Sequence, residues 1–278
     1  MGRCRARRRT GPKTQAGGGS PGSGRGCAPE AGQAQVSGRG TGSSVNLPRV
    51  AGLLQPLAQD LWIQRGPLRH LGVEYGRVGC LIRLRGGDLV LITPGPLRPD
   101  LAAEIAALGP LRHLVANNLF HNLFLSDWLA AFPGALCHAV PGFQGRYGLR
   151  VDRELGTAAP DGRWAEALQE LPVEGMPKVG EWLLLHRPSA SLIVGDLLFN
   201  LPAPRGWREA AMQRLLGLWG GPARGRRYPG FVSDPRAFEA SLERALKAGF
   251  ERLIPAHGEP IEAGAMAALR RVWRLPAG

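Results

Sequence analysis

The tetrapeptide Pro255-Ala256-His257-Gly258 directly follows the apolar run at residues 250–254, and this stretch decides how the chain is interpreted. A short apolar run bounded by glycine predicts a buried strand. The residues that follow such a strand lie at the edge of its sheet, where loops bring side chains together. We therefore expect the imidazole of His257 at a sheet edge, within reach of other polar groups.

Two other segments have the same form. Residues 191–194 are an apolar strand that runs into Gly195-Asp196, and residues 114–116 run into Asn117-Asn118-Leu119-Phe120-His121-Asn122. Histidine and aspartate are common ligands of divalent metals in proteins. Three strand ends that carry such residues predict one metal site at one edge of a sheet.

The rest of the chain predicts a layered α/β domain with mixed sheets. Arg85-Gly86-Gly87-Asp88 separates two apolar runs and is typical of a hairpin turn. Asp234-Pro235 is typical of a helix start. The expected strands are 60–63, 78–84, 89–92, 113–116, 136–140, 181–187, 192–194 and 252–254; the expected helices are 96–108, 123–132, 207–219, 234–248 and 262–274; residues 142–166 are expected to form a long loop.

The first fifty of the 278 residues differ from the remainder. They hold twelve glycines, nine basic residues and one acid, so they carry +8 of the net charge of +13. Such a segment buries too little apolar surface to offset its ordering entropy. We predict a disordered tail at 1–50 and a folded domain at 51–278. The tail either binds phosphates or an anionic surface, or is upstream sequence with the true start near Val45 or Val50.

Several classes of protein are excluded or disfavoured. No apolar run is long enough for a membrane span. The four cysteines form no Cys-x-x-Cys pair, which suits a reducing cytoplasm. No G-x-G-x-x-G motif and no G-x-S-x-G elbow stands between a predicted strand and a helix, and a Walker-type phosphate loop is absent from the sequence.

Four segments together resemble the metallo-β-lactamase superfamily over residues 53–275, and most closely an uncharacterised domain-of-unknown-function branch of it. They are Asn118-Leu-Phe-His121-Asn-Leu-Phe, residues 181–186, Gly195-Asp196-Leu-Leu-Phe-Asn200 and Ala256-His257-Gly258. The resemblance implies an αββα sandwich, with two mixed sheets flanked by helices. It also implies that Asp196 has the metal-bridging role and that His257 is the terminal histidine ligand.

The chain departs from the superfamily's ligand pattern. Members usually carry His-x-His-x-Asp-His after the strand, and aligning its last two residues with His121 and Asn122 puts Asn117 and Leu119 at the first two histidine positions. The resemblance therefore implies a reduced site of His121, Asp196 and His257. This site would hold one divalent ion (Zn, Mn or Fe) or none, and Asp196 and His121 would carry catalysis. Further ligands or supporting residues are expected among Asn117, Asn118, Asp127, Glu181 and His186.

Each of the three residues also has a structural interpretation. His257 could cap a strand, Asp196 could cap a helix that starts near Leu197, and His121 could bond a loop carbonyl.

Three functions follow. The first is a metal-dependent hydrolase of a small ester, thioester, amide or phosphoester, and the alternative is an inactive pseudoenzyme that binds small molecules. Nucleic-acid processing has the least support, because most of the basic charge lies in the tail.

Overall fold

The computed structural model describes residues 53–276, so the predicted tail at 1–50 lies outside the described residues. A large sheet has the strand order β1-β2-β5-β6-β7-β8-β9, and a small sheet has the order β10-β11-β12-β13. A hairpin of β3 and β4 stands apart from both. The strands are β1 Leu54–Ala58, β2 Leu61–Gly66, β3 Arg69–His70, β4 Val73–Glu74, β5 Arg77–Arg83, β6 Leu89–Ile92, β7 Leu111–Ala116, β8 Leu136–Ala139, β9 Arg153–Glu154, β10 Leu168–Pro172, β11 Trp182–His186, β12 Ser191–Val194 and β13 Arg252–Pro255.

Both sheets are mixed, as predicted. In the large sheet β1, β2, β5 and β6 pair antiparallel, and β6 to β9 pair parallel. In the small sheet β10, β11 and β12 pair antiparallel, and β12 pairs parallel with β13. Parallel neighbours end at the same sheet edge, so β12 and β13 place the residues that follow them side by side.

Side-chain alternation in the small sheet produces the layered arrangement. Leu184, Ile193 and Ile254 pack into the core shared with the large sheet. Their neighbours Leu183 and Leu192 point the other way, into a second core formed with helices. Because alternate residues of a strand face opposite sides, both faces of the central strands β11 and β12 are buried, and these two strands are largely apolar.

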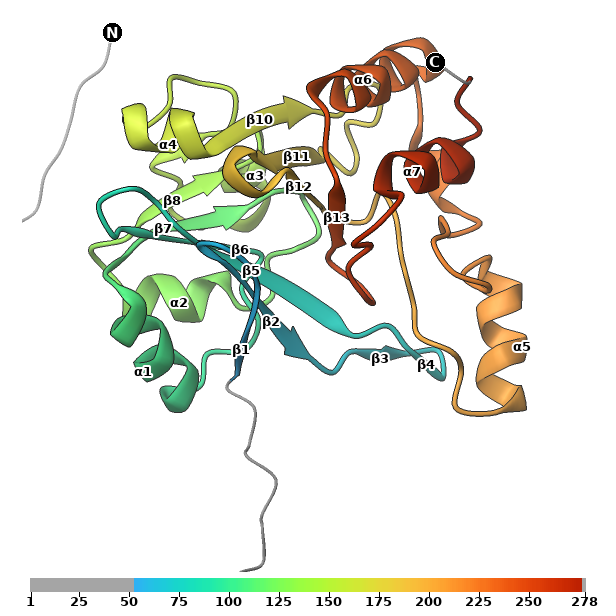
Figure 1. The fold of residues 1–278 in the computed structure, drawn as a ribbon, viewed down its shortest axis with the longest axis horizontal. Helices are drawn as coiled ribbons and strands as arrows, with labels where there is room; N and C mark the ends of the chain where they lie inside the picture. The colour runs from blue at the N-terminus through green and yellow to red at the C-terminus, as the bar shows by residue number, and fades with distance from the viewer. Residues whose placement is uncertain (1–52, 277–278) are drawn as a thin grey trace, which may run out of the picture. The chain divides into compact units, whose positions relative to one another are not determined.

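Helices cover the outer faces of both sheets (Figure 1). Helix α2 contacts β7 of the large sheet, whereas α6 contacts β10 and α7 contacts β13 of the small sheet. The helices are α1 Pro99–Leu108, α2 Leu125–Ala131, α3 Phe143–Tyr147, α4 Gly162–Ala167, α5 Trp207–Leu216, α6 Pro235–Ala248 and α7 Ala265–Trp273, with 3-10 turns η1 Arg187–Ser189 and η2 Tyr228–Phe231. The predicted two-sheet sandwich flanked by helices is confirmed.

Most predicted elements are present within a few residues of their expected bounds. The β5–β6 hairpin forms, and the Asp234 side chain caps α6 by accepting from the N–H groups of Arg236 and Ala237. The prediction of a long loop at 142–166 was wrong, because this segment contains α3, β9 and α4. These elements are two to six residues long, which is too short for a hydrophobic period to reveal.

Within residues 53–276, no helix has both the length and the apolar character that a membrane crossing requires.

Candidate metal centre

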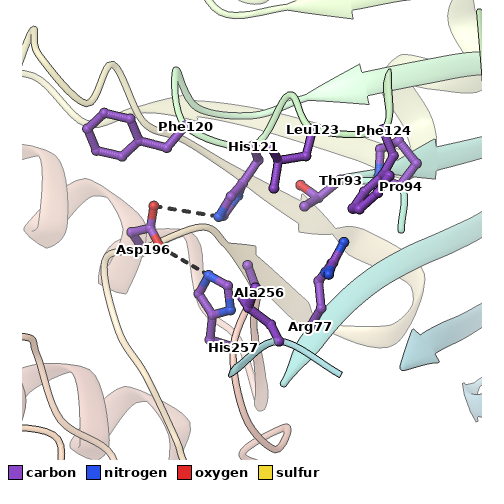
Figure 2. A pocket seen from close by; sticks show the side chains of 11 residues that line it. Arg77, Thr93, Pro94, Phe120, His121, Leu123, Phe124, Asp196, Ala256 and His257 are labelled. Atoms are coloured by element: carbon purple, nitrogen blue, oxygen red, sulfur yellow. Dashed lines mark ion pairs between the residues drawn. The ribbon is translucent and has the colours of Figure 1, made fainter. Parts of the chain in front are cut away.

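The structure brings together the three residues predicted as metal ligands. One ligand atom from each of His121, Asp196 and His257 lies within 4.8 Å of the other two. His121 Nε2 is 3.5 Å from Asp196 Oδ2, and His257 Nε2 is 3.4 Å from Asp196 Oδ1. Figure 2 shows the carboxylate between the two imidazoles, although the three residues come from distant parts of the chain.

The imidazole of His257 is fixed by the backbone of another strand. Its Nδ1 donates to the carbonyl of Gly76, just before β5, at 2.8 Å. This hydrogen bond orients the ring so that Nε2 faces Asp196. A histidine that donates through one nitrogen and binds through the other is the usual arrangement at metal sites.

Asn118 positions the other two members of the triad. Its amide nitrogen donates to Asp196 Oδ2 at 3.2 Å, and its amide oxygen accepts from the backbone N–H groups of Phe120 and His121. Gly195 permits this approach, because a Cβ at that position would lie 2.5 Å from Asn118 Nδ2. Asn118, which lies between the two positions where the superfamily has histidines, therefore orients two of the predicted ligands.

Glu181 anchors the loop that carries Asp196. It is fully buried and accepts from the N–H groups of Gly195, Asp196 and Leu197 and from the hydroxyl of Tyr228. Burial raises the pKa of Glu181 to about 7, and the nearby charge of Asp196 adds to this effect. With both oxygens engaged, Glu181 supports the site rather than serving as a fourth ligand, one of the roles considered for it.

Asp196 remains ionised in this environment. Burial acts to raise its pKa, but the charges and hydrogen bonds of His121 and His257 outweigh burial and hold the pKa well below its ordinary value. No helix begins at Leu197, so Asp196 does not have the alternative role of a helix cap. The result is an anionic oxygen donor set between two imidazoles.

The donor set fits a divalent cation. Apart from the Asp196 carboxylate, 3.5 Å from Nε2, the buried ring nitrogens of His121 have no partner among residues 53–276. Each imidazole nitrogen lies 3.4 or 3.5 Å from a different carboxylate oxygen of Asp196, and one ligand atom from each of the three residues lies within 4.8 Å of the others. Two nitrogens and a carboxylate suit zinc, manganese or iron.

The triad forms part of the wall of a cavity of about 240 Å³. Apart from the triad, the cavity is lined by apolar side chains, one threonine and one arginine. These residues are Leu68, Arg77, Thr93, Pro94, Phe120, Leu123, Phe124 and Ala256. Sequence reasoning did not identify them as cavity residues, because no motif marks residues that converge only after folding.

The other predicted residues lie away from the triad. Asn117 accepts from the Thr93 hydroxyl and donates to the Trp182 carbonyl, and so ties β7 to β11. Asp127 is exposed in the first turn of α2 and does not line the cavity.

His186 is the last residue of β11 and is hydrogen-bonded to Ser189. Five residues of extended chain, roughly 16 Å, separate it from Glu181 at the site end. The expectation that Asp127 or His186 supports the metal was therefore wrong.

Comparison with solved structures finds similar folds at low sequence identity. A metallo-beta-lactamase from Pontibacter korlensis has a TM-score of 0.58 at 11% identity and covers 80% of this chain and 99% of its own. A metallo-beta-lactamase from Hirschia baltica has a TM-score of 0.54 at 15% identity; the match covers 79% of this chain and 96% of that one. The metallo-beta-lactamase FIM-1 from Pseudomonas aeruginosa, in its mono-zinc form, has a TM-score of 0.52 at 12% identity; the match covers 80% of this chain and 96% of that one. No family model and no curated protein matches the sequence.

Proposed function

We propose that this chain, whose fold is that of the metallo-β-lactamases, is a metal-dependent hydrolase with a single metal site. The observation that supports this most strongly is the convergence of His121, Asp196 and His257 on one point in the wall of a cavity. Fold likeness alone does not establish activity. The proposal therefore rests on the donor set and on the buried nitrogens of His121, which have no partner among residues 53–276 apart from Asp196.

The chain's own residues would hold and orient the ion. Asp196 provides the anionic ligand, His257 provides Nε2 with its tautomer set by Gly76, and His121 provides a nitrogen with no competing partner. When bound, a divalent cation supplies Lewis acidity, which polarises a carbonyl or phosphoryl oxygen and lets water act as a nucleophile near neutral pH. We assign the catalytic roles to Asp196 and His121.

The substrate would be a small ester, thioester, amide or phosphoester. A cavity of about 240 Å³ lined mainly by apolar side chains suits a small molecule rather than a polymer. The buried free thiols of Cys80 and Cys137 support our proposal of a cytoplasmic location.

A binding-only pseudoenzyme remains the second candidate. Asn118, at a position where the resembled superfamily has its ligand-rich motif, is used for hydrogen bonding in this chain. A chain that had lost part of the superfamily's ligand motif would keep only a reduced set of three ligands. Metal content separates the two candidates.

The test is metal analysis by plasma mass spectrometry of the full chain, purified without a histidine tag. We expect about one equivalent of zinc, manganese or iron in the wild-type chain, and loss of this metal in His121→Ala, Asp196→Ala and His257→Ala. The matched control is His70→Ala, which removes an exposed histidine on β3 outside the cavity. Metal-free protein whose variants fold normally would support the pseudoenzyme instead.

A further inference from the structure

Helix α5 exposes large apolar side chains and buries polar ones, the reverse of the usual pattern of a surface helix. Trp207 is 76% exposed and Leu215 is 61% exposed, whereas Glu209 and Gln213 are buried. The Glu209 carboxylate accepts from the backbone N–H of Glu74, on β4, at 2.8 Å. This hydrogen bond ties the polar side of α5 to the β3–β4 hairpin, so its apolar side is held toward solvent.

The exposed side of α5 is an apolar stripe with an arginine on each flank. Trp207, Ala211 and Leu215 are spaced four residues apart, so they lie along one side of the helix. Successive residues of a helix are rotated by about 100°, which puts Arg208 on one flank of the stripe and Arg214 on the other. All five residues are exposed, and we call them the α5 face.

The tip of the β3–β4 hairpin extends this surface. Leu71, at the tip, is 57% exposed. It lines a surface hollow of about 560 Å³ together with Trp207, and two further arginines, Arg69 and Arg205, line the same hollow. Figure 1 shows the hairpin next to α5, and β4 contacts this helix. A second exposed leucine therefore lies beside the apolar stripe.

The net charge of the folded domain is concentrated around α5. Residues 205–227 hold six arginines and one acid, a net charge of +5. Residues 51–278 as a whole also carry +5, so the charges of the rest of that region balance. None of the six arginines forms an ion pair within residues 53–276. The surface around α5 therefore attracts anions.

We propose that the α5 face and Leu71 dock onto a membrane surface that contains anionic lipids. Tryptophan and leucine enter the boundary between headgroups and acyl chains, where tryptophan is enriched in membrane proteins. The flanking arginines pair with lipid phosphates. Since α5 is ten residues long, the helix lies on the bilayer rather than across it. This inference goes beyond the proposed hydrolase function and does not rest on it.

A single-stranded nucleic acid is the other anionic partner that tryptophan and arginine can bind. The aliphatic side chains favour lipid, because Leu71 and Leu215 offer a base no stacking surface and a phosphate no hydrogen bond. In addition, Arg208 lies over the Trp207 ring, with its Cζ 5.3 Å from the ring centre. A base that stacked on this side of the ring would have to displace the guanidinium.

Vesicle sedimentation of the full chain tests the proposal. The vesicles are equal parts phosphatidylcholine and phosphatidylglycerol, or phosphatidylcholine alone, and the wild type should bind the mixed vesicles more tightly. Trp207→Ala/Leu215→Ala should bind the mixed vesicles at least about tenfold more weakly. This double variant keeps every charge, so its loss cannot come from the basic segment at 1–50. The matched control is Leu136→Ala/Met266→Ala, which removes two exposed apolar side chains elsewhere and should bind like the wild type.

The arginines are tested in the same assay. Arg208→Gln/Arg214→Gln should weaken binding to the mixed vesicles and reduce its dependence on salt. Arg187→Gln/Arg236→Gln removes two exposed arginines outside residues 205–227 and is the matched control. Since these side chains are exposed, urea denaturation should show the same free energy of unfolding for both variants and the wild type.

Fluorescence quenching tests insertion directly. Mixed vesicles whose phosphatidylcholine is brominated in the acyl chains are added in excess, so that the whole chain is bound. The wild type should be quenched more strongly than Trp207→Phe, which lacks the inserted indole and keeps an aromatic ring.

Two results would overturn the inference. One is equal binding of the wild type and Trp207→Ala/Leu215→Ala, which means that the segment at 1–50 or another surface holds the vesicles. The other is equal quenching of the wild type and Trp207→Phe. Fluorescence anisotropy with a labelled polyuridine RNA tests the competing partner. Tight RNA binding that the same double variant weakens, without vesicle binding, would assign the α5 face to nucleic acid instead.

Discussion

A single buried carboxylate, that of Glu181, holds the loop that presents Asp196. It accepts four hydrogen bonds, from three consecutive backbone N–H groups and the Tyr228 hydroxyl. An ionised carboxylate has two acceptor oxygens and no donor, so Glu181 can accept all four hydrogen bonds. The geometry of the triad therefore depends on a residue that does not line the cavity.

Glu181→Gln replaces one acceptor oxygen by an amide donor that must face another donor. We expect the free energy of unfolding to fall by about 2–4 kcal/mol and the metal affinity to weaken with it. Urea denaturation measures the first quantity and metal titration the second. Glu166→Gln, which alters an exposed glutamate on α4, should change stability by less than about 0.5 kcal/mol. Equal stability of the two variants would contradict the anchoring role.

At the scale of elements, the end of β13 lies against the segment that follows β12. Gly258 has φ of +91°, and it forms an isolated parallel bridge with Asn200. A Cβ on Gly258 would lie 2.0 Å from the Asn200 carbonyl oxygen. This close approach of two backbones keeps His257 beside Asp196, and only glycine allows it.

Gly258→Ala should therefore destabilise the protein by about 2–4 kcal/mol and lower metal affinity, because one of the two backbones must move. Gly264→Ala is the matched control. Gly264 also has a positive φ, +67°, but no atom lies within 4 Å of where its Cβ would be. Its substitution should cost only about 1 kcal/mol. Thermal unfolding of both variants, followed by metal titration, measures the difference, and equal losses would show that the contact with Asn200 is unimportant.

At the scale of the whole described domain, three buried histidines outside the site make the fold sensitive to acid. His113 Nδ1 and His138 Nε2 are 2.9 Å apart, and Arg153 Nε donates to His138 Nδ1. Burial lowers the pKa of His138 to about 3, that of His186 to about 4, and also that of His113. His138 and His186 are therefore neutral in the folded state at pH 5, whereas in the unfolded chain histidines titrate near pH 6.5.

Stability should consequently fall as the pH drops below about 6.5, because the unfolded state then binds protons that the folded state does not. Glu181 has the opposite effect. Its pKa is raised to about 7 in the folded state, so the folded protein binds this proton at a higher pH than the unfolded chain, which offsets part of the loss caused by the histidines. The net direction is loss of stability with acid.

Urea denaturation at pH 7 and pH 5, in buffer with chelator, checks this expectation. His138→Gln should reduce the loss between these two pH values by about 2 kcal/mol, whereas the exposed His70→Gln should leave it unchanged. A wild-type protein that is equally stable at both pH values would show that the histidines are not held neutral.

The sequence by itself predicted most of the longer elements and the three candidate ligands. The apolar strands that run into residues 117–122, Gly195-Asp196 and His257 could be recognised because strand ends and helix caps leave local patterns in a single segment. Mixed sheets layered with helices could be predicted from the order of strands and helices along the chain, whereas the αββα sandwich was implied by the resemblance to the superfamily.

Only the tertiary structure decided which other residues belong to the site. Asp127 and His186 had suitable chemistry but lie elsewhere, whereas Arg77, Phe124 and the anchoring role of Glu181 left no local pattern. These relations join residues that are tens to more than a hundred positions apart. They are set by sheet order and by close backbone approaches such as that of Gly258 to Asn200, and no periodicity within one segment encodes them.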